Sequence, residues 1–198
     1  MKIIAFITLI LLTTHLSAAA TDEQRKQFKE DCAGGNATSC HNMGLMYEHG
    51  DCVSKDDSKA LKFFTQACDK NNYASCTSAA LLYEESPTLK QDMKKAFKLY
   101  SKACGGGDAF ACHNTAVYYS KQKGMKQVAI SLYDKACEGG YAESCMYLGR
   151  LYRDSREVAP DYAKAQEKFD MACELNNYLA CKELRILQEL DRAGYSKH

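Results

Sequence analysis

The chain has 198 residues, and its 26 Lys and Arg residues almost balance its 25 Asp and Glu residues. This balance argues against nucleic acid or an anionic surface as the ligand, because proteins that bind them usually present a strong basic field. The length fits one domain with a real core, and eleven cysteines without any tryptophan are the most unusual feature of the composition.

The first twenty residues, MKIIAFITLILLTTHLSAAA, predict a secretory signal peptide. Lys2 gives a positive start, residues 3–12 form an apolar run, and residues 17–20 form a small-residue cleavage region. A retained membrane anchor is the alternative, but the apolar run is too short to span a bilayer as a helix. We expect a periplasmic or secreted protein with one domain over residues 21–198, no membrane contact after signal removal, and disulfides formed in an oxidising compartment.

Paired cysteines repeat along the rest of the chain. The two members of a pair are eight residues apart, and successive pairs begin 36, 36, 33 and 36 residues apart, which indicates a repeat array. The pairs are Cys32 and Cys40, Cys68 and Cys76, Cys104 and Cys112, Cys137 and Cys145, and Cys173 and Cys181.

A helix is predicted to end near the first cysteine of each pair. An aromatic residue stands four positions before that cysteine and, in four copies, an alanine stands eight before it, so both share one helical face. Asp56, Asp92 and Asp161 are expected to cap the starts of these helices. The aromatic column is Phe28, Phe64, Tyr100, Tyr133 and Phe169, and the alanine column is Ala60, Ala96, Ala129 and Ala165.

A turn follows each first cysteine. Three positions after it lies a Gly or Asn, the residue types that best tolerate the left-handed conformation in which helices end. These residues are Gly35, Asn71, Gly107, Gly140 and Asn176.

A second helix is predicted to begin around the second cysteine. A small residue lies four positions after this cysteine and a tyrosine seven positions after it in four of the five copies, so the two columns share one face. The columns are Gly44, Ala80, Ala116 and Gly149, and Tyr47, Tyr83, Tyr119 and Tyr152.

Each cysteine pair therefore brackets the turn of an antiparallel helix hairpin, where the two positions come within disulfide reach. Pairing within each hairpin is the only pattern that repeats with the array, so we expect five such disulfides. Closing a ring of this size stabilises the fold by about 2.5 kcal/mol on the chain-entropy model.

These columns resemble the SLR family, the Sel-like repeats related to TPR proteins. The stretch HNMGLMYEHGDCVSKDDSKALKFFTQAC, residues 41–68, is similar to the family's signature, and the cysteine pairs resemble the branch typified by the Helicobacter cysteine-rich proteins. The resemblance covers about Phe28 to Leu190 and implies an all-α, right-handed α-solenoid of about five disulfide-stapled hairpins with a C-terminal capping helix. Arg185 and Gln188 replace the small residue and the tyrosine in the last copy, where we expect a polar end.

The resemblance implies an interaction protein that binds a partner on its concave face, with no cofactor. Early residues of the second helices would line this face, and asparagines there could hold a peptide backbone, although an Asn could instead bond a neighbouring turn. We expect a protein or peptide partner or a peptidoglycan fragment, in a scaffold, inhibitor or immunity role. The candidate residues are His41, Asn42, Ser78, His113, Asn114 and Tyr147.

The cysteine-rich branch also implies an alternative function, which is penicillin binding with slow hydrolysis of the β-lactam amide bond. A serine β-lactamase needs a nucleophilic Ser with a Lys one helical turn further on. Ser120 and Lys123 have this spacing, but no S-D-N or K-T-G motif accompanies them. No catalytic residue is therefore assigned, and we favour the binding function.

His41, His49 and Cys52 lie close together in the sequence but lack the spacing of a zinc site, so we expect no metal. Cys52 is the eleventh cysteine and lies in the turn Gly50–Val53. We expect a half-buried free thiol there, and the alternative is an intermolecular disulfide or a redox contact.

Overall fold

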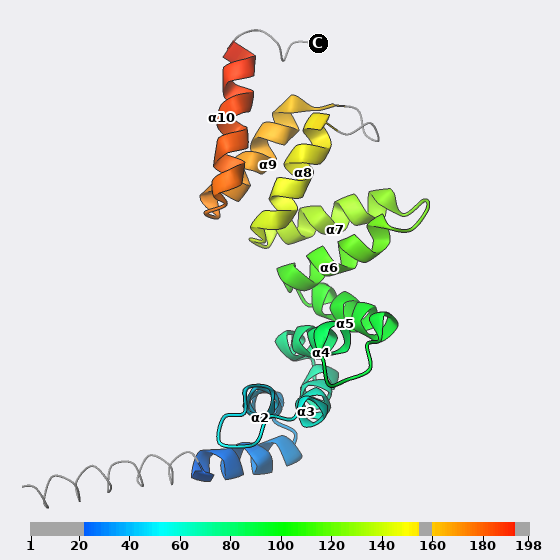
Figure 1. The fold of residues 1–198 in the computed structure, drawn as a ribbon, viewed down its shortest axis with the longest axis vertical. Helices are drawn as coiled ribbons and strands as arrows, with labels where there is room; N and C mark the ends of the chain where they lie inside the picture. Colours follow the sequence, from blue (N-terminus) through cyan, green and yellow to red (C-terminus); the bar gives the residue numbers. More distant parts are fainter. Residues whose placement is uncertain (1–21, 155–159, 193–198) are drawn as a thin grey trace, which may run out of the picture. The chain divides into compact units, whose positions relative to one another are not determined.

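The computed structural model describes residues 22–154 and 160–192, and the predicted signal peptide, residues 1–20, lies outside them (Figure 1). Residues 22–33 form the first helix, and no strand occurs in the described part of the chain, which confirms the all-α prediction. The later helices are α2 (Ala37–His49), α3 (Asp57–Asp69), α4 (Tyr73–Glu85), α5 (Met93–Gly105), α6 (Ala109–Ser120), α7 (Lys126–Glu138), α8 (Ala142–Asp154), α9 (Tyr162–Glu174) and α10 (Tyr178–Arg192).

The helices belong to two compact units, residues 1–96 and 97–198. In the first unit, α3 packs against both α2 and α4. In the second unit, α7 packs against α6 and α8, and α9 packs against α8 and α10. Packing between sequence neighbours is the arrangement expected of a helical repeat protein.

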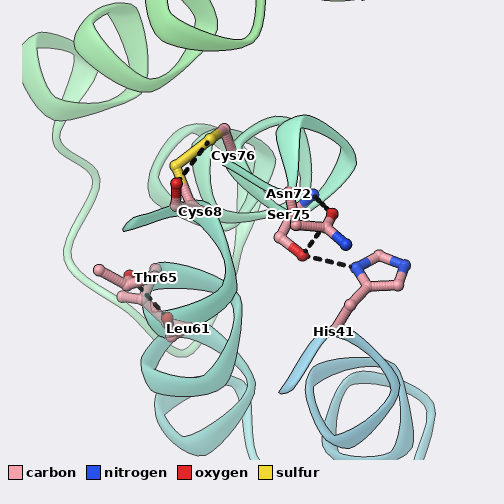
Figure 2. The surroundings of a disulfide bond; sticks show 7 residues. All are labelled: His41, Leu61, Thr65, Cys68, Asn72, Ser75 and Cys76. Atoms are coloured by element: carbon pink, nitrogen blue, oxygen red, sulfur yellow. Dashed lines mark hydrogen bonds between the residues drawn. A yellow bond between two sulfur atoms is a disulfide. The ribbon is translucent and has the colours of Figure 1, made fainter. Parts of the chain in front are cut away.

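All five predicted disulfides are present, each joining the end of one helix to the start of the next. The Cys68–Cys76 bond is drawn in Figure 2, and its two Cα atoms are 4.7 Å apart, within the normal range. The others are Cys32–Cys40, Cys104–Cys112, Cys137–Cys145 and Cys173–Cys181.

The turns inside these hairpins also agree with the prediction, because every residue three positions after a first cysteine has a positive φ. At Asn71 the angle is 63°, and its N–H donates to the carbonyl of Cys68 at 2.9 Å, which closes the end of α3. The other angles are 99° at Gly35, 95° at Gly107, 90° at Gly140 and 65° at Asn176.

The predicted aspartate caps are present as well. The Asp161 carboxylate accepts a hydrogen bond from the backbone N–H of Lys164 at 3.0 Å, and the Lys164 ammonium lies 5.4 Å from the ring centre of Tyr152. Asp56 and Asp92 make the same backbone bonds, to Lys59 and Lys95. Helix α7 differs, because it follows Met125 and has no side-chain cap.

The small residues of α2 and α8 allow a buried phenylalanine to lie against the helix backbone. A methyl group placed on Gly44 would come within 2.5 Å of the Phe64 ring, and one on Gly149 within 2.6 Å of the Phe169 ring. Both rings are completely buried. Glycine is therefore required at these two positions for packing.

The exposed side of α10 is only partly polar. Arg185 is exposed as expected, but Leu179, Ile186 and Leu190 keep 57%, 40% and 41% of their surface exposed. Across residues 22–154 and 160–192, no helix is both long enough and apolar enough to cross a bilayer.

Candidate binding surface

The two predicted groove histidines connect neighbouring helices. Nδ1 of His41 on α2 lies 2.7 Å from Oγ of Ser75 on α4, as Figure 2 shows. In the second unit, Nδ1 of His113 on α6 lies 2.8 Å from Oγ of Ser144 on α8. These hydrogen bonds hold the starts of α2 and α4, and of α6 and α8, side by side.

Partial burial lowers the pKa of both histidines below the ordinary value of 6.5. At His113 this effect is opposed by the weaker attraction of Glu143, which raises the pKa. Both rings are therefore neutral at neutral pH, where each links two helices through one ring nitrogen.

The three other polar candidates are half-buried. Asn114 donates from Nδ2 to the carbonyl of Phe110 at 3.2 Å, one turn earlier in α6, so part of its amide is used within its own helix. The side chains of Asn42 and Ser78 form no hydrogen bond with the residues that the structure describes. Asn42 and Asn114 belong to different units, so we assign a shared surface only within the second unit.

Tyr147 is the most exposed of the candidates. Its side chain is 39% exposed, and its ring centre lies 4.2 Å from that of Tyr133, which is 3% exposed. Burial raises the pKa of Tyr133 above 10.0, so its hydroxyl stays protonated at neutral pH. His113 also contacts Tyr133, with the two ring centres 5.4 Å apart in an edge-on arrangement.

We call the set Asn114, Tyr147, His113 and Tyr133 the α6–α8 surface. Asn114 directly follows His113 and Tyr147 lies one turn after Ser144, so both are close in sequence to the two residues that the His113–Ser144 bond joins. The surface thus includes the exposed ring of Tyr147, which packs on the buried ring of Tyr133, and the Asn114 amide, part of which is not used within its own helix. Such groups suit the recognition of a peptide or protein surface.

Charged side chains lie further along α8. Arg153 pairs with Asp154 and with Glu183 of α10, and these hydrogen bonds raise the pKa of its guanidinium. Arg150, which is exposed, lies 3.7 Å from the same Glu183 carboxylate. The pairs connect α8 to α10 and leave Arg150 accessible beside Tyr147.

Sequence reasoning did not single out Ser75, Ser144 or Tyr133 as parts of this arrangement. The sequence held a usable signal, because both hydrogen-bonded pairs occupy the same positions. The histidine directly follows the second cysteine of one pair, and the serine directly precedes the second cysteine of the next pair. The buried tyrosine belonged to a column interpreted only as core.

Ser120 and Lys123 do not form a serine–lysine pair. The Ser120 hydroxyl donates to the carbonyl of Val117 at 2.8 Å, at the exposed end of α6. Lys123 lies beyond the end of this helix and not one turn along it. Lys123 is therefore not positioned as a base for this hydroxyl.

The histidines and the free cysteine of the first unit do not come together as ligands. His41 is bonded to Ser75, and within the described residues no group of three or more His, Cys, Asp or Glu could hold a metal ion. Cys52 is a free thiol, but the expected half-buried position was wrong, since it is exposed. The reason is the bend after Gly50, where Cys52 takes a left-handed φ of 58° outside the helix pair.

A sequence profile of the Sel1 repeat matches four consecutive segments, residues 37–72, 74–108, 109–141 and 142–177. The chain belongs to the Sel1 repeat family. In this frame each repeat begins with the helix that carries a second cysteine and ends with the helix that carries the next first cysteine. Each disulfide therefore joins a Sel1 repeat to the segment before or after it, and three of the five join one repeat to another.

Several solved structures are similar to this chain. A Sel1 repeat protein from Oxalobacter formigenes is 28% identical, with a TM-score of 0.73 over 86% of this chain and 71% of its own. Cysteine rich protein B of Helicobacter pylori is 30% identical, with a TM-score of 0.50 over 68% of this chain and 99% of its own, which agrees with the predicted cysteine-rich branch. Immunity protein Pa5087 from Pseudomonas aeruginosa shares the fold at 19% identity and a TM-score of 0.51, over 79% of this chain and 59% of its own. No curated protein sequence matches the chain significantly.

Proposed function

We propose that this Sel1 repeat protein is exported and binds a protein or peptide partner through the α6–α8 surface. The observation that carries the proposal is the exposed ring of Tyr147, which lies against the buried ring of Tyr133 at 4.2 Å between ring centres. An aromatic side chain held in place by a buried neighbour loses little conformational entropy on binding, which is why such residues often anchor interfaces.

Export is supported by the signal-like residues 1–20 and by the five disulfides. Disulfides form and persist in oxidising compartments, so we place the domain over residues 21–198 in the periplasm or outside the cell. Cleavage after the small residues 17–20 would release it from the membrane.

The proposed partner is a protein, in an inhibitor, immunity or scaffold role. Sel1 repeat proteins generally mediate protein interactions, and immunity proteins are among the structures that share this fold. The identity to those immunity proteins is 19% and 22%, so the likeness supports the scaffold and does not identify a target. We do not extend the proposal to β-lactam hydrolysis, because α6 ends at Ser120 and Lys123 is not one helical turn further along it.

Site-specific photocrosslinking tests the proposal. A photoreactive phenylalanine at position 147 should crosslink one protein in periplasmic extract, whereas the same group at position 128 should not. Val128 on α7 is a matched control, since it is 43% exposed against 39% for Tyr147. Equal crosslinking from both positions, or none from position 147, would exclude the α6–α8 surface.

A double substitution gives the energetic test. Asn114→Ala/Tyr147→Ala should weaken binding of the crosslinked partner at least about tenfold, which corresponds to about 1.4 kcal/mol. Val128→Ala should leave it unchanged. If the partner is a peptidoglycan fragment, the loss should appear with purified muropeptides and not with protein.

A further inference from the structure

A cavity of about 740 Å³ lies over the Cys32–Cys40 disulfide in the first unit. Its walls come from the end of helix 22–33, from the turn that follows it, and from α3. None of the α6–α8 surface residues lines it, so it is a separate site.

The cavity is lined by three lysines and one acidic residue. Lys29, Lys62 and Lys70 are exposed and form no ion pair with any residue that the structure describes. Asp69 is the single carboxylate in the lining. Three ammonium groups around one opening therefore produce a local positive charge on a chain that is otherwise nearly neutral.

The floor of the cavity is apolar. Cys32 and Cys40 are buried with Ala67, and the half-buried ring of Phe63 packs against this cluster. A ligand with an aliphatic stem and a negatively charged end would thus bury its stem on the floor while its charge remains among the lysines.

The local sequence explains why the cavity is open. The turn after Cys32 consists of Ala33, Gly34 and Gly35, whereas the equivalent turn after Cys68 is Asp69–Asn71, with three larger polar side chains. A methyl group on Gly35 would come within 3.2 Å of the Lys70 Nζ atom, so the ammonium lies directly over this glycine. The three small residues of this turn therefore contribute little side-chain volume to the lining.

We propose that this cavity binds an acidic peptide segment, with Glu or Asp carboxylates between the three ammonium groups and their methylenes on Phe63. A nucleic acid fits less well, because its backbone requires a longer basic track than one cavity with three lysines. The site goes beyond the partner surface on α6 and α8, and it would give the protein a second contact of different chemistry.

Fluorescence anisotropy with the intact oxidised protein tests the assignment, using labelled hexaglutamate, hexaglutamine and an oligothymidylate of equal length. Hexaglutamate should bind saturably and more weakly at higher salt. Lys29→Ala/Lys62→Ala/Lys70→Ala should weaken it at least about tenfold. Lys98→Ala is the matched control, because Lys98 stands 36 residues after Lys62 in the next copy, outside the cavity, and should have no effect.

A second variant fills the cavity with an internal carboxylate. Ala33→Asp copies the aspartate that follows Cys68 in the next copy, so the turn should fold normally while the new carboxylate competes with the ligand. We expect a loss of hexaglutamate affinity of about tenfold or more at an unchanged melting temperature.

Three results would overturn the proposal: no saturable hexaglutamate binding by the folded protein, an equal loss in Lys98→Ala, or oligothymidylate binding as tight as hexaglutamate. Tyr147→Ala should leave hexaglutamate binding intact, so this site and the α6–α8 surface can fail independently.

Discussion

The repeats at residues 109–141 and 142–177 have the same two-helix architecture but use their inner aromatic residue differently. In the second of them, Gly149 lets the Phe169 ring lie against the α8 backbone, and this ring is completely buried. In the first, Ala116 occupies the glycine position, and the Tyr133 ring lies against the ring of the exposed Tyr147, with an angle of 34° between the ring planes. Glycine at this packing position thus occurs with a fully buried ring, whereas alanine occurs with a buried ring that contacts an exposed one.

The same two repeats differ at the start of their second helix. Asp161 caps α9 through the backbone N–H of Lys164, whereas α7 follows Met125 without a side-chain cap. The first repeat, which contributes three of the four α6–α8 surface residues, is also the one in which successive cysteine pairs begin 33 and not 36 residues apart. The missing helix cap and the shorter interval therefore occur in the repeat that contributes most of the candidate site.

The largest expected effect is on the melting temperature, when the disulfide that joins these two repeats is removed and compared with the disulfide that follows them. Cys137→Ser/Cys145→Ser should lower the melting temperature by about 5–10 °C, since opening the ring costs about 2.5 kcal/mol and also uncouples two repeats. Cys173→Ser/Cys181→Ser frees only α10 and should have a smaller effect. Thermal unfolding followed by circular dichroism measures both, and an equal or larger shift for the second variant would contradict the account.

The next largest effect is a loss of stability when Gly149, which packs against the Phe169 ring, is replaced. Gly149→Ala should destabilise the protein by about 1–3 kcal/mol, because the added methyl group overlaps the Phe169 ring. The reciprocal change, Ala116→Gly, removes a methyl group without any clash and should cost about 1 kcal/mol. Urea unfolding compares them, and a neutral or stabilising Gly149→Ala would show that the ring can move away.

The cap difference predicts a smaller loss. Asp161→Ala should reduce the free energy of unfolding, because it removes the acceptor for the Lys164 N–H. Met125→Ala, at the uncapped equivalent, should change it by less than about 0.5 kcal/mol. Equal losses in the same urea titration would mean that the carboxylate does not contribute to the stability of α9.

The smallest effect is a pH dependence confined to the first of these repeats, since the second has Met146 where the first has His113. Burial keeps the pKa of folded His113 below 6.5, so the unfolded chain takes up the proton first as the pH falls. Its contribution is therefore fully present above about pH 6.5 and is lost below it. Between pH 7 and pH 5 the wild type should lose more stability than His113→Gln, and parallel pH curves would contradict this.

Most of the fold could be predicted from sequence because the signal recurs five times. The left-handed turn at Asn71, the aspartate cap at Asp161 and the Cys68–Cys76 pairing each follow from a residue type at a fixed spacing. Local chemistry determines such features, so reading them requires no knowledge of the tertiary contacts.

The candidate site was less accessible from sequence, because it depends on contacts between helices. The His113–Ser144 bond spans 31 residues, and predicting the contact of Tyr147 with Tyr133 requires knowing which side of α8 faces α7. The cavity near Cys32 is lined in part by Gly34 and Gly35, which a search for chemical groups does not detect. The burial of Cys52 was predicted wrongly because no other repeat has a cysteine at this position for comparison.

Peptide mapping of the non-reduced protein after alkylation tests the central claim most directly. The account predicts five disulfide-linked peptides, each joining cysteines eight residues apart, with Cys52 alkylated, since it is free and exposed. An abundant bridge between non-consecutive cysteines, a bridged Cys52, or recovery of the protein only in reduced form would contradict a secreted array stapled repeat to repeat.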